Sequence, residues 1–184
     1  MSAGLEAEYG DGSLGAAAAE SGSAPSVLVL GAGNLLLKDD GVGIHVLRRL
    51  EKLELPGEVT LLDAGTGIHR LLEEFSRFDR LIVLDCVQAG AEPGAVFRFR
   101  PEDVRESRGV TTSLHQMGLL EILEMARLLD RLPETVIIGI QPGDASPWGE
   151  ELTPEVEARL DRVVQIVLEE LQACAAAPGR SGHA

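Results

Sequence analysis

Four short apolar runs, most of them closed by glycine or proline, recur through the middle of the chain. They read SVLVLGAG, EVTLLDAG, RLIVLDCV and TVIIGIQP and occupy residues 26–33, 58–65, 80–87 and 135–142. A continuous run such as the first is typical of a strand buried on both faces of a parallel sheet. The run 80–87 is the most apolar of the four. The pattern therefore predicts four central strands.

Two helices are predicted between the first three strands. The first is opened by Asp39 and Asp40, and its apolar positions at helical spacing are Val42, Val46, Leu50 and Leu53. The second is short and follows the run 58–65, through Leu71, Leu72 and Phe75. Strand and helix signals thus alternate along the chain, as they do in proteins with a parallel sheet.

Two further helices carry recognisable start signals. Ser113 and Gln116 form a capping box, which predicts a helix from there to about Leu129. Thr153 at the N-cap and Pro154 at the first helical position predict a long final helix. Its buried stripe is Val156, Leu160, Val163, Val164, Val167 and Leu171.

The segment 95–100, AVFRFR, shows the alternation of an edge strand, with its phenylalanines on one face and its arginines on the other. The link that joins it to the run 80–87 contains Pro93 and Gly94 and is too short for a crossover helix. We therefore expect these two segments to form an antiparallel hairpin.

Together these elements predict an α/β fold with three layers: a mostly parallel, twisted, five-stranded sheet with helices on both faces and one antiparallel edge strand, as in phosphorylase/hydrolase-like folds. Residues 25–174 have the size of a single domain. The flanking segments 1–24 and 175–184 are rich in Gly, Ala and Ser and have little to bury, so they are predicted to be disordered tails.

The charge balance narrows the classes of partner. The 184 residues include 16 basic and 30 acidic side chains, a net charge of −14. Phosphates would be repelled by this excess, so nucleic acid and anionic membranes are not expected as partners. No run approaches the roughly 20 apolar residues that cross a bilayer.

The remaining compositional signals predict a cytoplasmic protein. The first basic residue is Lys38, so the N-terminal segment lacks the charged region of a secretory signal. Only Cys86 and Cys174 are present, one at the end of an apolar strand and one near the C-terminus. Two unpaired thiols fit a reducing compartment better than a disulfide framework does.

Three polar residues, distant in sequence, are predicted to meet at one edge of the sheet. Asp40 follows the first strand, Asp85 closes the third, and His115 begins a helix reached through a loop long enough to return to that edge. In open α/β sheets, sites form beyond the carboxyl ends of the strands. The pair Gln141-Pro142, which closes the last strand, can reach the same place.

The chemistry of this set suits a metal ion. Carboxylates supply hard oxygen donors and a neutral imidazole supplies nitrogen, a mixture that binds nickel, zinc and other divalent first-row ions. His115 would be the second residue of its helix, where the positive end of the helix dipole disfavours protonation. Asp85, after an apolar strand, would be a costly buried charge that a cation relieves.

Each residue also has a purely structural interpretation. Asp40 is suited to cap a helix, although Asp39 can serve as that cap and leave Asp40 free for other work. Asp85 can accept hydrogen bonds from backbone amides at the strand end, and His115 can be a hydrogen-bonded structural residue. Asp63, after the second strand, either supports the site from behind its ligands or caps the following turn.

The main competing interpretation is dinucleotide binding. Gly31 and Gly33 follow a strand, and Asp63 stands where a ribose-binding acid would be. However, Leu36 replaces the third glycine of the fingerprint, and two aspartates would face the pyrophosphate at the helix N-terminus. The sequence has no P-loop, no G-x-S-x-G elbow and no H-E-x-x-H helix, so nucleotide hydrolysis and two common hydrolase classes lack support.

The motifs as a set resemble the maturation endopeptidases of NiFe hydrogenases. The matching segments are LVLGAGNLLLKDDGVGIHV, LLDAGTG, LIVLDCV, SLHQMGL, IGIQP and WGEELTP, in the family's order, over about residues 26–173. Ala64 is a departure, because many relatives have a second glycine in the corresponding turn.

The resemblance implies a hydrolase that removes a C-terminal extension from the hydrogenase large-subunit precursor after nickel insertion. It places the metal contacts, and the candidates for catalysis, at Asp40, Asp85 and His115, with nickel supplied by the precursor and no nucleotide cofactor. It leaves open an aspartyl-type or a metal-dependent cleavage, since bound metal can either polarise a carbonyl or activate water.

The loop 142–153, with Trp148, is expected to help hold the precursor. A nickel- or dinucleotide-binding module without peptidase activity is the alternative.

Overall fold

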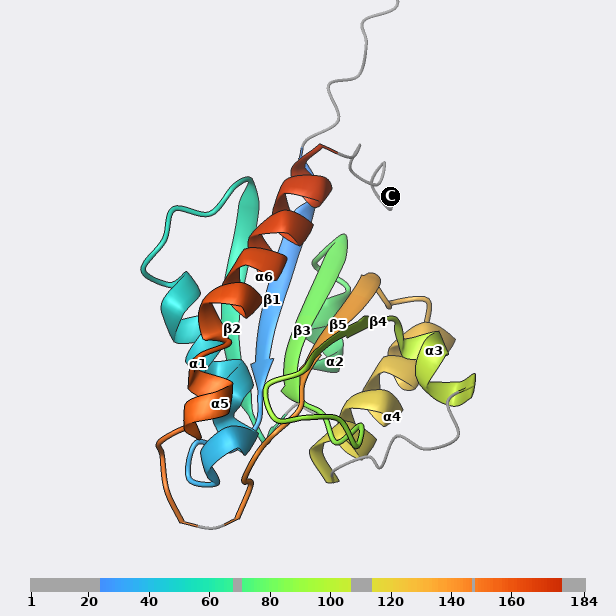
Figure 1. Ribbon diagram of the computed structural model, residues 1–184. Helices are drawn as coiled ribbons and strands as arrows, with labels where there is room; N and C mark the ends of the chain where they lie inside the picture. The colour runs from blue at the N-terminus through green and yellow to red at the C-terminus, as the bar shows by residue number, and fades with distance from the viewer. Residues whose placement is uncertain (1–23, 68–70, 107–113, 147, 177–184) are drawn as a thin grey trace, which may run out of the picture.

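The computed structural model describes residues 24–67, 71–106, 114–146 and 148–176, with only the backbone described at 104–106 and 114–117. Five strands form one sheet in the order β2-β1-β3-β5-β4 (Figure 1). Their bounds are β1 Ser26–Ala32, β2 Glu58–Gly65, β3 Arg80–Cys86, β4 Val96–Phe99 and β5 Glu134–Ile140. The first four in this order are parallel and β4 is antiparallel, so the predicted fold class is confirmed.

The partner of the edge strand differs from the prediction. β4 is antiparallel and at the edge, but it pairs with β5 and not with β3. β3 is the central strand, with β1 on one side and β5 on the other, so neither of its edges is free for a hairpin. The connection 87–95 instead crosses the carboxyl end of β5, where Gly94 N–H donates to the Gln141 carbonyl.

Helices cover both faces of the sheet, as expected for a three-layer fold. On one face lie α1 Val42–Leu50, α5 Pro154–Glu157 and α6 Leu160–Ala175. On the other face lie α2 Leu72–Phe75 and α4 Leu114–Leu128, while α3 Pro101–Glu106 follows the edge strand. Alternate residues of the strands face the two cores, since Val27 and Val29 pack in the first and Leu28 and Leu30 in the second.

Helix boundaries depart from the prediction at two places. The segment opened by Asp39 and Asp40 is a 3₁₀ turn, η1 Lys38–Gly41, and α1 ends at Leu50, which leaves Leu53 exposed. The predicted final helix is divided into α5 and α6. There the N–H of Arg159 bonds the carbonyl three residues back, which tightens the turn, yet the predicted apolar stripe stays buried across the break.

The predicted tails and the Ser113 capping signal lie almost entirely outside the described residues. Within the described part of the chain, no helix combines the length and the apolar character needed to cross a membrane.

Candidate metal-recognition site

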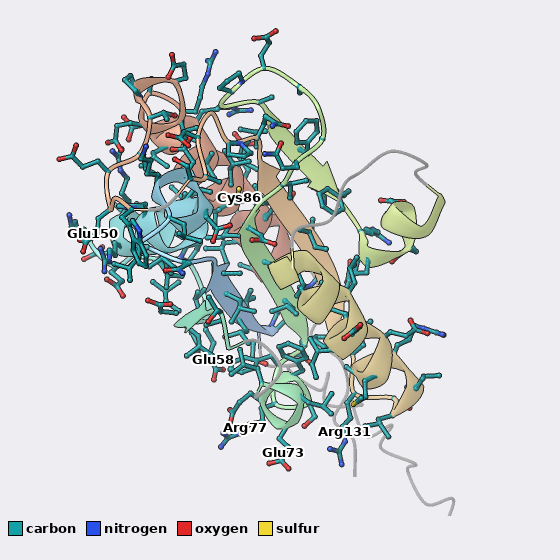
Figure 2. The ribbon with its side chains drawn as sticks, turned by 90° about the horizontal axis from the view of Figure 1, so that it is seen from below. Glu58, Glu73, Arg77, Cys86, Arg131 and Glu150 are labelled. Carbon is teal, nitrogen blue, oxygen red and sulfur yellow. The ribbon has the colours of Figure 1, made fainter. Side chains whose placement is uncertain are left out.

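Asp40 and Asp85 lie at the same edge of the sheet, beyond the carboxyl ends of two neighbouring parallel strands. Asp85 is the next-to-last residue of β3, and Asp40 belongs to η1, which follows β1. Both are buried: Asp85 is 1% exposed and Asp40 is 6% exposed. Figure 2 looks onto this edge, where the labelled Cys86 marks the end of β3. The structure therefore brings together the two predicted carboxylates.

Close backbone packing explains why η1 stands next to β3. A Cβ on Gly43, near the start of α1, would lie 2.2 Å from the Leu84 carbonyl oxygen and 2.6 Å from that of Ala32. Only glycine lets the helix start sit this close to both strand ends. Gly33, at φ +126°, makes the preceding turn. The glycines thus fix where the Asp40 carboxylate can lie.

Only one of the two Asp85 carboxylate oxygens has a hydrogen-bond partner among the described residues. Its Oδ1 accepts the N–H of Cys86 at 2.8 Å, whereas Oδ2 is buried without a hydrogen-bond partner among the residues that the structure describes. Burial raises the pKa of Asp85 to about 7, and the neighbouring charge of Asp40 acts in the same direction. An acceptor of this kind has an unmet demand for a proton or a cation.

Asp40 does not cap the following helix. Its Oδ2 accepts the N–H of Asn34 at 2.8 Å, and Gly41 stands at the N-cap of α1 without a side-chain cap bond. The carboxylate is therefore held by the loop after β1 and directed towards the strand ends. The structural interpretation of Asp85, a bond to a backbone amide, holds for one of its two oxygens.

His115 is the second residue of α4, as the sequence predicts. Its side chain lies outside the described residues, so its approach to the two carboxylates stays a prediction. Among the side chains that the structure does describe, no three of His, Cys, Asp or Glu gather closely enough to hold a metal ion. Asp40 and Asp85 are thus two members of a set whose third member is the predicted His115.

Cys86 is not suited to act as a nucleophile at this edge. Burial, followed by the charges of Asp40, Asp85 and Asp39, raises the pKa of its thiol well above the usual range. A thiol of this kind stays protonated and unreactive at neutral pH. The site therefore offers buried carboxylates rather than a thiolate.

Gln141 shapes the loop beside Asp85. Its side chain is buried, its Oε1 accepts the N–H groups of Ala89 and Ala91, and its Nε2 donates to Gln88 Oε1 at 2.8 Å. One amide therefore fixes the start of the connection from β3 to β4. The predicted position of Gln141 at this edge, directly after β5, is confirmed.

Asp39 has a role that differs from the predicted helix cap. It is fully buried, and its Oδ1 accepts the N–H of Thr153 at 2.7 Å. Its Oδ2 accepts the N–H groups of Gly143 and Asp144 and the hydroxyl of Thr153. Asp39 thus fastens the segment after β5 to η1. No local sequence pattern predicts these hydrogen bonds of Asp39, because the partners are more than a hundred residues away in sequence.

The glycines expected of a dinucleotide site serve internal packing. A Cβ on Gly33 would lie 1.9 Å from the Asp40 carbonyl oxygen, so the space near this glycine holds the protein's own 3₁₀ turn. Asp63 is exposed and its Oδ1 accepts the N–H of Gly65 at 2.8 Å, so it caps its own turn. Neither observation favours a bound pyrophosphate.

Comparison with known proteins gives a consistent result. A family model described as hydrogenase maturation protease matches residues 44–170. The chain is 39% identical over 137 residues to the hydrogenase expression/formation protein HupD of Bradyrhizobium diazoefficiens, covering 73% of this chain and 71% of that protein. It is 34% identical to the hydrogenase 2 maturation protease of Escherichia coli, covering 79% and 90%.

Solved structures agree with the sequence comparison. The hydrogenase maturating endopeptidase HybD from E. coli superposes with a TM-score of 0.73 at 33% identity, covering 80% of this chain and 93% of that one. HybD from Thermococcus kodakarensis superposes with a TM-score of 0.67, also at 33% identity, covering 79% and 99%.

Proposed function

The chain belongs to the hydrogenase maturation protease family, and from this premise we propose that it removes the C-terminal extension of a NiFe hydrogenase large-subunit precursor once nickel is in place. In this proposal nickel arrives with the precursor and is part of the substrate. Asp40, Asp85 and His115 contact it, and the protease needs no nucleotide.

The observation that carries the proposal is Oδ2 of Asp85, which is buried without a hydrogen-bond partner among the described residues and lies beside a second buried carboxylate. Two carboxylates supply hard oxygen donors that suit a divalent first-row ion. An imidazole from His115 would complete a set of three protein ligands and leave positions open for ligands of the precursor. The donor set therefore fits a metal that is shared between protease and substrate.

The electrostatics of the pair suggest how nickel loading controls cleavage. Without a cation, burial favours a proton on Asp85, whose pKa is raised to about 7. A precursor that brings nickel supplies positive charge beside the two carboxylates, and the proton on Asp85 is released. A precursor without nickel leaves two buried acids facing each other, which weakens its binding.

The test is processing of a nickel-loaded precursor by the wild type and by Asp40→Ala, Asp85→Ala and His115→Ala. We expect each variant to lose most of its processing rate. Asp161→Ala, an exposed acid on α6 paired with Arg49, serves as the matched control and should cleave as the wild type does. Circular dichroism verifies that each variant is folded.

The outcomes separate the alternatives. Normal cleavage by all three site variants would remove the metal-contact assignment and leave the family's protease activity standing. Nickel binding without any precursor cleavage by the wild type would favour the non-catalytic binding module. Calorimetry with NAD tests the dinucleotide version directly, and we expect no binding.

We also propose that the protein acts in the cytoplasm. This rests on the two cysteines, which are buried and form no disulfide in the described part of the chain, since a reducing compartment keeps thiols in this state.

A further inference from the structure

We propose that a shallow hollow beside the carboxylate site, bordered by Trp148, binds a segment of the precursor that carries a Lys or Arg side chain next to an apolar residue. The proposal rests on the proposed function, because it assumes that the substrate is the hydrogenase precursor. It adds a second contact region, outside the residues that would touch nickel.

The hollow is formed by residues 148–153 and the stem of Lys38 and has a volume of about 500 Å³. Lys38, which lines the hollow, begins the 3₁₀ turn that also carries Asp40, so the hollow and the carboxylate site share this turn. In Figure 1 the segment between β5 and α5 runs below the carboxyl ends of the strands, next to η1. A substrate bound at the carboxylates would therefore have its neighbouring residues near the hollow.

The backbone of the hollow is held at several points. The N–H of Gly149 donates to the Leu36 carbonyl and the N–H of Lys38 donates to the Gly149 carbonyl, so the two segments form a short parallel bridge. At the other end of the segment, Asp39 accepts both the N–H and the hydroxyl of Thr153.

A third fastening point is His45 on α1, whose Nε2 lies 3.1 Å from the Glu150 carbonyl oxygen. The carbonyl can only accept, so His45 donates from this nitrogen. The labelled Glu150 lies at the outer margin of the molecule in Figure 2. A segment anchored this firmly loses little conformational freedom when a partner binds.

Two large apolar side chains are nevertheless exposed on this rigid frame. Trp148 is 82% exposed and Leu36 is 49% exposed, and they precede the bridged residues Gly149 and Leu37 in their two segments. Exposed apolar side chains on a pre-organised frame are typical of binding surfaces, where tryptophan often contributes most of the affinity.

The charges of the hollow define the partner's chemistry. The ammonium of Lys38 is paired with Asp144, whose carboxylate offsets its positive charge. Glu150 and Glu151 line the hollow and have no ion-pair partner among the described side chains. Two free carboxylates beside an indole ring favour a guanidinium or ammonium group, which can bind the acids and lie over the ring. An acidic segment would be repelled.

Steady-state processing of the nickel-loaded precursor tests the proposal. We expect Trp148→Ala to raise KM about tenfold with kcat nearly unchanged, because the lost contact is remote from the scissile bond. The double variant Glu150→Gln with Glu151→Gln should also raise KM, and added salt should reduce the difference between it and the wild type. Leu128→Ala on α4, exposed and far from this edge in sequence and in the fold, is the matched control.

Fluorescence supplies a second readout, because Trp148 is the sole tryptophan of the chain. A tryptophan-free pentapeptide with a central Arg flanked by Leu should change the emission of the wild type, and the same peptide with Glu for Arg should not. Equal responses to the two peptides would overturn the charge argument.

An unchanged KM for Trp148→Ala would overturn the docking proposal as a whole. The proposed function would survive that result if Asp85→Ala remained inactive on the same precursor, so the two failures are distinguishable.

Discussion

Replacing Asp85 by Asn should change how the stability of the metal-free protein depends on pH. Asp85 has a folded-state pKa of about 7, raised from an ordinary value of 3.8 by burial. The folded state therefore holds a proton that the unfolded state releases over this range. Stability is lost as the pH rises from the lower value to the higher one, and Asn removes this dependence because it cannot ionise.

The magnitude follows from the size of the shift. About three pKa units at 1.36 kcal/mol each give a loss of about 4 kcal/mol in the free energy of unfolding between about pH 4 and pH 8. At the lower pH the protonated Asp85 and the Asn variant are both neutral and nearly the same shape, so their stabilities should be close. At the higher pH the variant should be more stable by as much as this amount.

Urea unfolding of the chelator-treated protein, followed by circular dichroism across this pH range, measures the difference. Asp161→Asn, whose carboxylate is 91% exposed, controls for the loss of a charge and should track the wild type at every pH. Curves for wild type and Asp85→Asn that run parallel would refute the reasoning, because they would show that the carboxyl group titrates at the same pH in the folded and unfolded states.

Three further results are expected. Asp39→Ala should lower the free energy of unfolding by about 3 kcal/mol in urea titrations, because it leaves three partly buried N–H groups and the Thr153 hydroxyl without their acceptor. Gly43→Ala should prevent stable folding, since the new Cβ would lie 2.2 Å from a strand carbonyl, whereas Gly118→Ala on α4, with nothing within 4 Å, should raise the melting temperature slightly. Cys86 and Cys174 should resist alkylation in the native protein and react only on unfolding, because both are buried and burial raises the pKa of each thiol.

Much of the fold follows from periodicity in the sequence. Continuous apolar runs located the four parallel strands, and apolar spacing located the helices that cover them. The wrong partner for β4 has a physical cause: a short link limits how far a strand can travel but does not say which neighbour still has a free edge. That depends on the order of the whole sheet, in which β3 is already enclosed by β1 and β5.

The site was predictable to the extent that strand ends define it. The buried positions of Asp40 and Asp85 agree with an edge that collects residues after parallel strands. The structural role of Asp39 could not be predicted, because its hydrogen bonds join segments that are far apart in sequence and share no local pattern. That Oδ2 of Asp85 has no hydrogen-bond partner among the described residues could not be predicted either, since only the packing shows which polar atoms are buried away from backbone N–H groups.

Two consecutive aspartates of one 3₁₀ turn have different roles. Asp39 holds the segment after β5 by hydrogen bonds, and Asp40 faces the ends of the strands. For protein engineering, residues 148–152 can therefore be replaced as a unit, provided that Asp39 and Thr153 are retained to hold the end of the segment. Sequences grafted from relatives should transfer substrate preference without disturbing Asp40 and Asp85 if the Asp39–Thr153 hydrogen bonds are kept. Grafts that lose these hydrogen bonds should impair both substrate binding and the carboxylate site.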